Sequence, residues 1–275
     1  MTVQPTSKWL QNYLDSPFSN MTDKMKQHRD ILCKPIEAYF DEVNALSIQN
    51  HLLHHGLFPP SPSDEHIINK WLQRKYDQLV EKLYKKYRKA WSGPSANIFI
   101  FPSNYHSKEL NERFSGCTGL SYPKKLFLFI NHQAKAKQVA ALFLHEYSHT
   151  CRLNFFKKSE ADYTLLDAII LEGVAEYVVR SILGEEFGNQ WIKHYSYDEA
   201  KWYIEKWVYP NLTVTRNQPK HDLIMYGNMH GIPQNLGYHI GYYLIQQFTK
   251  DKTFSIKEIL YIDNGDAFNS NDWLK

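Results

Sequence analysis

The pentapeptide His-Glu-Tyr-Ser-His at residues 145–149 contains the residue types of a metal site. On a helix, residues four positions apart lie on one face, so the imidazoles of His145 and His149 can reach a single ion. Neutral imidazole nitrogen is a preferred ligand of zinc. Glu146 lies beside the two histidines and can take a proton from a water that the metal activates. The motif therefore predicts a Zn²⁺ site with an adjacent general base.

The residues that precede this motif predict that it is buried. The run VAALFL at 139–144 is apolar on nearly every side of a helix. Imidazole and carboxylate groups in such a helix need partners, because an unsatisfied buried polar group is costly. In the alternative, purely structural reading, each of these side chains finds a tyrosine, a backbone carbonyl or a salt bridge with Arg152.

A second apolar segment, LLDAIILEGVAEYVV at 165–179, carries two glutamates. Glu172 and Glu176 are four residues apart and share a helix face, and two buried like charges are unfavourable unless a positive charge lies opposite. A zinc ion supplies that charge. We expect Glu172 to be the third ligand and Glu176 to accept the free N–H of a ligand histidine. The alternative is that both glutamates extend to solvent.

The order His145-Glu146-x-x-His149, then Glu172-Gly173-x-Ala175-Glu176, resembles the gluzincin metallopeptidases, the thermolysin-like group. The segments HEYSHTCRL, TLLDAIILEGVAEY and GYHIGYYLI are similar to the YjaZ-like family of predicted bacterial zinc-dependent proteases. The likeness covers residues 93–260 well and the preceding helices loosely.

This resemblance implies a zincin-like catalytic core and a zinc-dependent peptidase. It implies His145, His149 and Glu172 as ligands, Glu146 as the base and Glu176 as the residue that orients a ligand histidine. Gluzincin aminopeptidases hold the substrate amine with a Gly-x-Met-Glu-Asn motif before the zinc helix. The matching stretch here, KKLFLFINHQ at 124–133, has no glutamate. An endopeptidase acting on a peptide or protein is therefore favoured.

An oxyanion formed during hydrolysis needs a hydrogen-bond donor besides the metal. Candidates lie in YGNMHGIPQNLGYHIGYY at 226–243, where Tyr238 and His239 open a helix. We favour Tyr238 because the GYxIGY pattern recurs in the family. Equally, the tyrosines can be aromatic core and His239 a surface residue.

Two further features could form sites. The strand at 125–130 can pair with an extended substrate, or it can be a core strand. The three histidines of HLLHH at 51–55 have no carboxylate at ligand spacing, so a second metal site is not expected there. A metallohydrolase of a non-peptide amide or ester, and a non-catalytic zinc-binding module, remain alternatives to a peptidase. The intact Glu146 argues against the last of these.

Composition is that of a globular protein. Of 275 residues, 43% are hydrophobic and 22% charged, and the net charge is only +3, which argues against a nucleic-acid binder. The first twenty residues lack the apolar core of a signal peptide, and no transmembrane segment is expected. Three cysteines without CxxC spacing indicate free thiols in a reducing compartment. We expect a cytoplasmic protein, with its oligomeric state left open.

The elements needed to position the site predict a mostly helical α+β fold. We expect an N-terminal helical region over 1–92 and a zincin-like catalytic region over 93–275. The expected strands, at 96–101 and 125–130, form a small antiparallel sheet. The metal-bearing helices are expected at about 133–153 and 164–183, the second with a capping-box start at Thr164 and Asp167. The other expected helices run over about 22–56 with a break at Pro35, 64–91, 197–209, 237–250 and 255–261.

Overall fold

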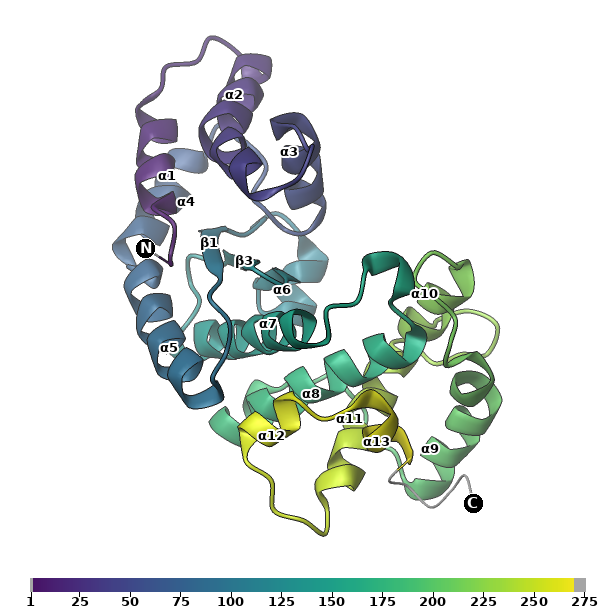
Figure 1. Ribbon diagram of the computed structural model, residues 1–275. Coiled ribbons are helices and arrows are strands. Elements are labelled where there is room, and N and C mark those ends of the chain that lie inside the picture. Colours follow the sequence, from purple (N-terminus) through teal and green to yellow (C-terminus); the bar gives the residue numbers. More distant parts are fainter. Residues whose placement is uncertain (1, 270–275) are drawn as a thin grey trace. The chain divides into compact units, whose positions relative to one another are not determined.

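The computed structural model describes residues 2–269, which are mostly helical with one small sheet (Figure 1). The strands are β1 (Asn97–Pro102), β2 (Thr118–Tyr122) and β3 (Lys125–Ile130). The first helices are α1 (Thr6–Asp15), α2 (Met21–His28), α3 (Ala45–His54), α4 (Asp64–Gln73), α5 (Tyr76–Trp91) and α6 (Lys108–Phe114). The later ones are α7 (Ala136–Phe156), α8 (Leu165–Leu183), α9 (Tyr197–Tyr203), α10 (Pro219–Tyr226), α11 (Leu236–Thr249), α12 (Ile256–Leu260) and α13 (Asn264–Asn269). The expected α+β class is confirmed.

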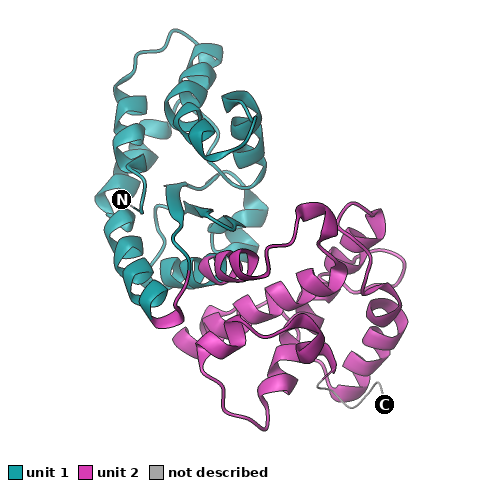
Figure 2. Ribbon diagram, in the orientation of Figure 1, with its two compact units in different colours: residues 1–89, 94–146 teal, residues 90–93, 147–275 magenta. Residues whose placement is uncertain are grey.

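The chain divides into two compact units (Figure 2). Unit 1 comprises residues 1–89 and 94–146, and unit 2 comprises residues 90–93 and 147–275. The boundary falls inside the continuous helix α7, directly after Glu146. The expected division of function between residues 1–92 and 93–275 stays a prediction.

The sheet of unit 1 is mixed, so the prediction of an antiparallel sheet was wrong. Its strand order is β1-β3-β2, with β1 parallel to β3 and β2 antiparallel to β3. The segment between β1 and β3 contains α6 and β2, which is long enough for the crossover that a parallel pair requires. Strand β2, which is not among the strands expected from the sequence, takes one edge. Strand 125–130 is therefore the central core strand, and the substrate-pairing alternative for it was wrong.

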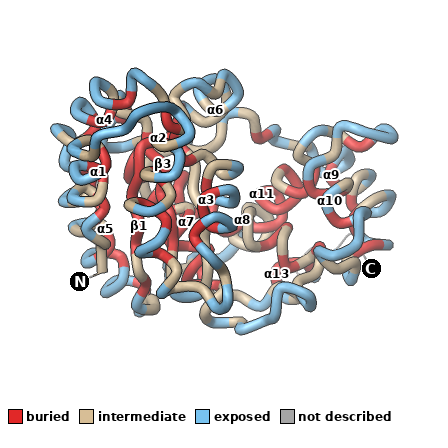
Figure 3. The backbone as a smooth tube through the Cα atoms, turned by 90° about the horizontal axis from the view of Figure 1, so that it is seen from above, coloured by how far each residue is buried: buried red, intermediate tan, exposed pale blue. Residues whose placement is uncertain are grey.

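The two faces of this sheet have different partners, because side chains alternate along a strand. On one face Phe99 of β1 stacks on Phe127 of β3 with ring centroids 4.8 Å apart, and Trp9 of α1 packs against Phe99. On the other face, Gly119 and Ser121 of β2 lie against Glu146 of α7. The strands β1 and β3 are almost wholly buried (Figure 3).

Two long helices expected in unit 1 are each divided. The segment 22–56 forms α2, a π-helical turn, a 3₁₀ helix containing Pro35 (Lys34–Tyr39) and α3, so the predicted break at Pro35 is confirmed. The segment 64–91 is two helices, not one. Lys75 between them has a left-handed φ of 52°, which stops the helical hydrogen bonding.

Unit 2 is organised around α8 and α11, which cross in direct contact (Figure 1). The contact depends on two glycines. A Cβ on Gly173 would collide with the backbone of Gly241, and a Cβ on Gly241 would collide with the carbonyl oxygen of Ile169. Backbone therefore packs on backbone at this crossing. Figure 3 shows that α11 is largely buried.

No helix within residues 2–269 is both long enough and apolar enough to span a membrane.

The glycine contact between α8 and α11 yields a test of the fold. Gly241→Ala places a methyl group against the Ile169 carbonyl, and overpacking of this kind costs about 1–3 kcal/mol. We expect a Tm several degrees lower by circular dichroism. Gln247→Ala, on a half-buried position of the same helix, is the control and should leave the Tm nearly unchanged. Equal Tm values for the two variants would contradict the assigned helix contact.

Candidate metal centre

The side chains of His145, His149 and Glu172 come together at one point. Each offers one ligand atom, and the three atoms lie within 4.8 Å of one another. Nε2 of His149 is 3.5 Å from Oε2 of Glu172. Within residues 2–269 this is the one such group of three metal-ligating side chains. The structure thus brings together all three residues that the sequence analysis named as ligands.

The geometry of this cluster fits a zinc ion. With bonds of 2.0–2.2 Å and tetrahedral angles, two donor atoms on one zinc lie roughly 3.4 Å apart. The separation of 3.5 Å between His149 and Glu172 matches that value without rearrangement. Two imidazole nitrogens and one carboxylate are also the donor set of open, catalytic zinc sites. The side chains of His149 and Glu172 are 8% and 17% exposed, so the carboxylate is largely shielded from bulk water.

Helix α7 sets the spacing of the two histidines. Its apolar residues Val139, Phe143, Leu144 and Tyr147 are fully buried and anchor the helix in the protein core. One helical turn separates His145 from His149, so both rings leave the same face.

Helix α8 carries the third candidate ligand, Glu172. It begins at a complete capping box, in which the Thr164 side chain accepts from the Asp167 N–H and the Asp167 carboxylate accepts from the Thr164 N–H. The predicted helix start is therefore confirmed. Glu172 directly precedes Gly173, whose backbone contact with α11 fixes the position of this turn.

Glu176 has partners that the sequence analysis did not foresee. Its Oε1 accepts hydrogen bonds from Arg180 Nε at 2.6 Å and from the Asn189 backbone N–H at 2.8 Å, and its Oε2 accepts from Asn189 Nδ2 at 2.9 Å. Within the described chain the donors are thus Arg180 and Asn189 rather than a histidine. The sequence does contain a signal for the arginine. Glu176 and Arg180 are four residues apart, and this spacing places the guanidinium on the same helix face as the carboxylate.

Arg152 does not pair with the ligand cluster. Its guanidinium donates to the backbone carbonyls of Leu260 and Ile262 and to Oδ1 of Asn264. This buried arginine therefore joins α7 to the segment between α12 and α13. The alternative in which Arg152 forms a salt bridge with the side chains of the 145–149 motif was therefore wrong.

Glu146 is buried, with 6% of its surface exposed, and its side chain meets strand β2. The Ser121 hydroxyl lies 2.6 Å from Glu146 Oε2 and 2.7 Å from the Glu146 carbonyl oxygen. Sequence analysis missed this partner, because nothing local links residues 25 positions apart.

His239 is a buried and hydrogen-bonded residue of α11. Its Nδ1 accepts a hydrogen bond from the Lys193 backbone N–H, and its ring packs against Trp191 and Tyr195. Burial is the main cause that lowers the pKa of His239 to about 4, although a hydrogen bond with the Gln234 backbone opposes the shift. The ring is therefore neutral at pH 7. The alternative reading of His239 as a surface residue was wrong.

The glycines of the GYHIGY pattern are explained by packing. Gly241 makes the crossing with α8, and a Cβ on Gly237 would collide with the sulfur of Met225. The pattern therefore gives no separate support to a catalytic role for Tyr238.

Tyr238 is connected to Glu172 through another tyrosine, Tyr226 at the end of α10. Burial raises the pKa of the Tyr226 hydroxyl, and the Glu172 carboxylate raises it further, whereas a side-chain hydrogen bond with Tyr238 acts in the opposite direction. Burial and, to a smaller extent, Glu172 also raise the pKa of Tyr163. Both phenols therefore stay protonated and can donate hydrogen bonds near the Glu172 carboxylate.

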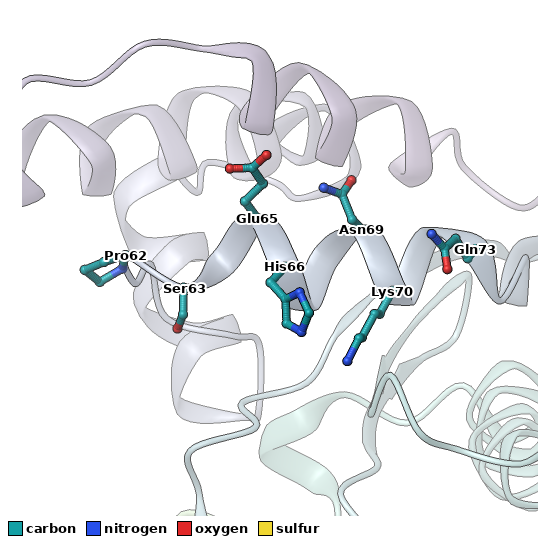
Figure 4. A pocket seen from close by; sticks show the side chains of 7 residues that line it. All are labelled: Pro62, Ser63, Glu65, His66, Asn69, Lys70 and Gln73. Atoms are coloured by element: carbon teal, nitrogen blue, oxygen red, sulfur yellow. The ribbon is translucent and has the colours of Figure 1, made fainter.

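Two other features involve none of these residues. His51, in the HLLHH segment, bonds the Tyr122 hydroxyl at 2.8 Å, and its ring packs against His55. A hollow of about 510 Å³ is lined by α4 and the turn before it, including Glu65, His66 and Lys70 (Figure 4). It is lined by none of the candidate ligands.

Comparisons with known proteins identify a family and relatives in one bacterium. A family model described as "Predicted Zn-dependent protease" matches residues 76–268. Protein YjaZ of Bacillus subtilis (strain 168) is 27% identical over 248 residues, which cover 90% of this chain and 91% of that protein. YjfC of the same organism is 20% identical over 174 residues, which cover 60% of this chain and 57% of YjfC. No solved structure matches the chain.

The matched range contains Glu146 and all three candidate ligands, and it spans well over half of the chain. The chain therefore belongs to the YjaZ-like family of predicted zinc-dependent proteases.

Proposed function

We propose that the protein is a zinc-dependent metallopeptidase of the gluzincin type, with a zincin-like core. The observation that carries the proposal is the convergence of His145, His149 and Glu172, with Glu146 next to the first histidine on α7. An ion held by these three side chains supplies Lewis-acid activation of water and of the substrate carbonyl group.

The residues of the chain have separate tasks in this proposal. Glu146 accepts a proton from the attacking water and passes it to the leaving amine. One molecule of water is consumed for each peptide bond cleaved. Glu146 suits this task because it neighbours the cluster without belonging to it. The Tyr238 hydroxyl, linked to Tyr226, remains the favoured donor to the oxyanion. His239 is not favoured, because its ring is engaged by Lys193 and Gln234.

We propose an endopeptidase acting on peptides or proteins. An aminopeptidase anchors the free amine of its substrate with a carboxylate ahead of the zinc helix. Residues 124–133, which include β3 and the turn before α7, contain no carboxylate that can do this. Digestion of a proteome-derived peptide library tests this point, because an endopeptidase yields internal cleavages. Removal of single terminal residues would overturn the proposed specificity.

Metal analysis tests the ligand set. The full-length chain, purified without chelator, should carry about one zinc per molecule by mass spectrometry of its metals. His149→Ala should lose this zinc, because two donors remain. His54→Ala is the control, since it removes a histidine outside the cluster and should leave the zinc content intact. A wild-type chain that stays free of metal after zinc addition and dialysis would refute the site.

Glu146→Gln separates chemistry from metal binding. The amide has nearly the same size but cannot accept a proton, so hydrolysis of the peptide library should fall about 10²–10⁴-fold while zinc content stays at the wild-type level. Glu112→Gln, on α6, controls for the loss of one negative charge. Full activity of Glu146→Gln would show that another group is the base. If zinc-loaded wild-type protein cleaves neither peptides nor simple amides and esters, the protein is a non-catalytic zinc-binding module.

The two glutamates of α8 should behave in opposite ways. Glu172→Gln should lose most zinc affinity because it removes a charged ligand. Glu176→Gln should keep the zinc but lower the Tm of the metal-free protein, because it weakens buried hydrogen bonds to Arg180 and Asn189 worth about 1–3 kcal/mol. Zinc titration and thermal unfolding of both apo-variants provide the comparison. Loss of zinc in Glu176→Gln with an unchanged apo Tm would make Glu176 the ligand.

A further inference from the structure

Strand β2 presents two residues to the side chain of Glu146. Gly119 and Ser121 are two positions apart, so they lie on the same face of the strand. Both strand positions pair with β3, Gly119 opposite Leu128 and Ser121 opposite Leu126. The sheet therefore determines where this pair stands, and neither residue depends on a flexible loop for its position.

Ser121 contacts one specific oxygen of the Glu146 carboxylate. Its Oγ is 2.6 Å from Oε2, a distance typical of a hydroxyl that donates to a charged oxygen. The same Oγ lies 2.7 Å from the Glu146 carbonyl oxygen, so the single hydroxyl proton is directed at Glu146 in either case. This contact holds the side chain and the backbone of one residue against the strand.

Gly119 provides the space in which the carboxylate lies. A Cβ at this position would be 2.5 Å from Cγ, 2.6 Å from Cδ and 2.7 Å from Oε1 of Glu146. Each of these distances is closer than carbon and oxygen atoms approach without displacement. The absence of a side chain at residue 119 is thus a requirement for the observed orientation of Glu146. Oε1 faces Gly119 and Oε2 faces Ser121.

We propose that Ser121 is a positioning residue for the base Glu146, with Gly119 as the gap that admits the carboxylate. The inference rests on the proposed peptidase function of Glu146. Ser121 donates to Oε2 and restricts rotation of the carboxylate, which leaves Oε1 as the oxygen that accepts the proton of water. A base held in its reactive orientation lowers the barrier because that ordering does not have to occur during the reaction.

A merely structural role for Ser121, as a tie between β2 and α7, predicts different behaviour. Such a tie would contribute to stability, and its loss would lower the Tm without a selective effect on the chemical step. A positioning role requires that kcat falls while KM, zinc content and Tm stay close to wild type. A positioning role also depends on the hydroxyl group itself. Ser121→Thr, which keeps the hydroxyl, should therefore recover the kcat that Ser121→Ala loses.

The test compares three variants of the full-length, zinc-loaded protein with one control. Ser121→Ala should lower kcat about ten- to a hundredfold, the loss expected for a hydrogen bond to a charged group, and Ser121→Thr should restore most of it. Gly119→Ala should lower kcat by displacing the carboxylate although the Ser121 hydroxyl is retained. Ser103→Ala is the control, because Ser103 is a buried serine at the end of β1 whose Oγ lacks a hydrogen-bond partner in the described structure. It should leave kcat unchanged.

A crystal structure of the zinc-loaded wild type and of Ser121→Ala gives a readout that does not depend on activity. We expect Ser121 Oγ within hydrogen-bond distance of Glu146 Oε2 in the wild type and a rotated or multiply oriented carboxylate in the variant. Unchanged kcat in Ser121→Ala, no recovery in Ser121→Thr, or an identical carboxylate orientation in both crystals would overturn the proposal. If the wild type cleaves no substrate, the peptidase proposal fails, and the crystal comparison still decides the role of Ser121.

Discussion

Charged side chains buried on two apolar helices are the constraint on which the rest of this structure depends. Helices α7 and α8 carry imidazole, carboxylate and guanidinium groups among fully buried aliphatic and aromatic residues. A buried charge without a partner is strongly unfavourable, so each group must be matched by a donor, an acceptor or an opposite charge. Arg152 is matched by the carbonyls of Leu260 and Ile262, and Asp167 by Lys158 and Thr164. These matches connect the helices to segments far away in the sequence.

The two glutamates of α8 lie in different surroundings. Glu176 is matched within its own unit by Arg180 and Asn189, so its charge requires no metal ion. Glu172 lies 3.5 Å from His149 and belongs to the group of three metal-ligating side chains. In the proposed function, a zinc ion held by the two histidines and Glu172 balances the charge of this carboxylate. The two negative charges on this helix face are thus balanced in different ways. Arg180 balances Glu176, and the proposed zinc balances Glu172.

Close backbone packing provides the precision that such a site needs. Gly173 and Gly241 let α8 and α11 touch directly, and the residue before Gly173 is the third candidate ligand. Gly119 plays a comparable part in unit 1, where it leaves room for the carboxylate of Glu146. Ligand positions held by backbone contacts vary less than positions held by long side chains. The glycines near the site are therefore explained by the close approach of backbone or side-chain atoms to their Cα atoms, not by a need for flexibility.

The sequence by itself determined the local features. Periodicity and spacing predicted the helices α7 and α8, the cap at Thr164, and the shared helix face of His145 and His149, because all of these depend on neighbours within one or two helical turns. Glu172 was named from the buried acidic pair on its own helix and from the family resemblance, and the structure brings it to the two histidines. Only the tertiary structure decided the partners across long separations: β2 as an edge strand, the parallel pairing of β1 with β3, Ser121 on Glu146, and Lys193 on His239. These contacts depend on which surfaces meet after folding, and no local pattern of side chains encodes that meeting. Glu176 combines a local and a tertiary partner. Arg180 is four residues away on the same helix and was visible in the sequence, whereas Asn189 reaches Glu176 only because the loop after α8 folds back.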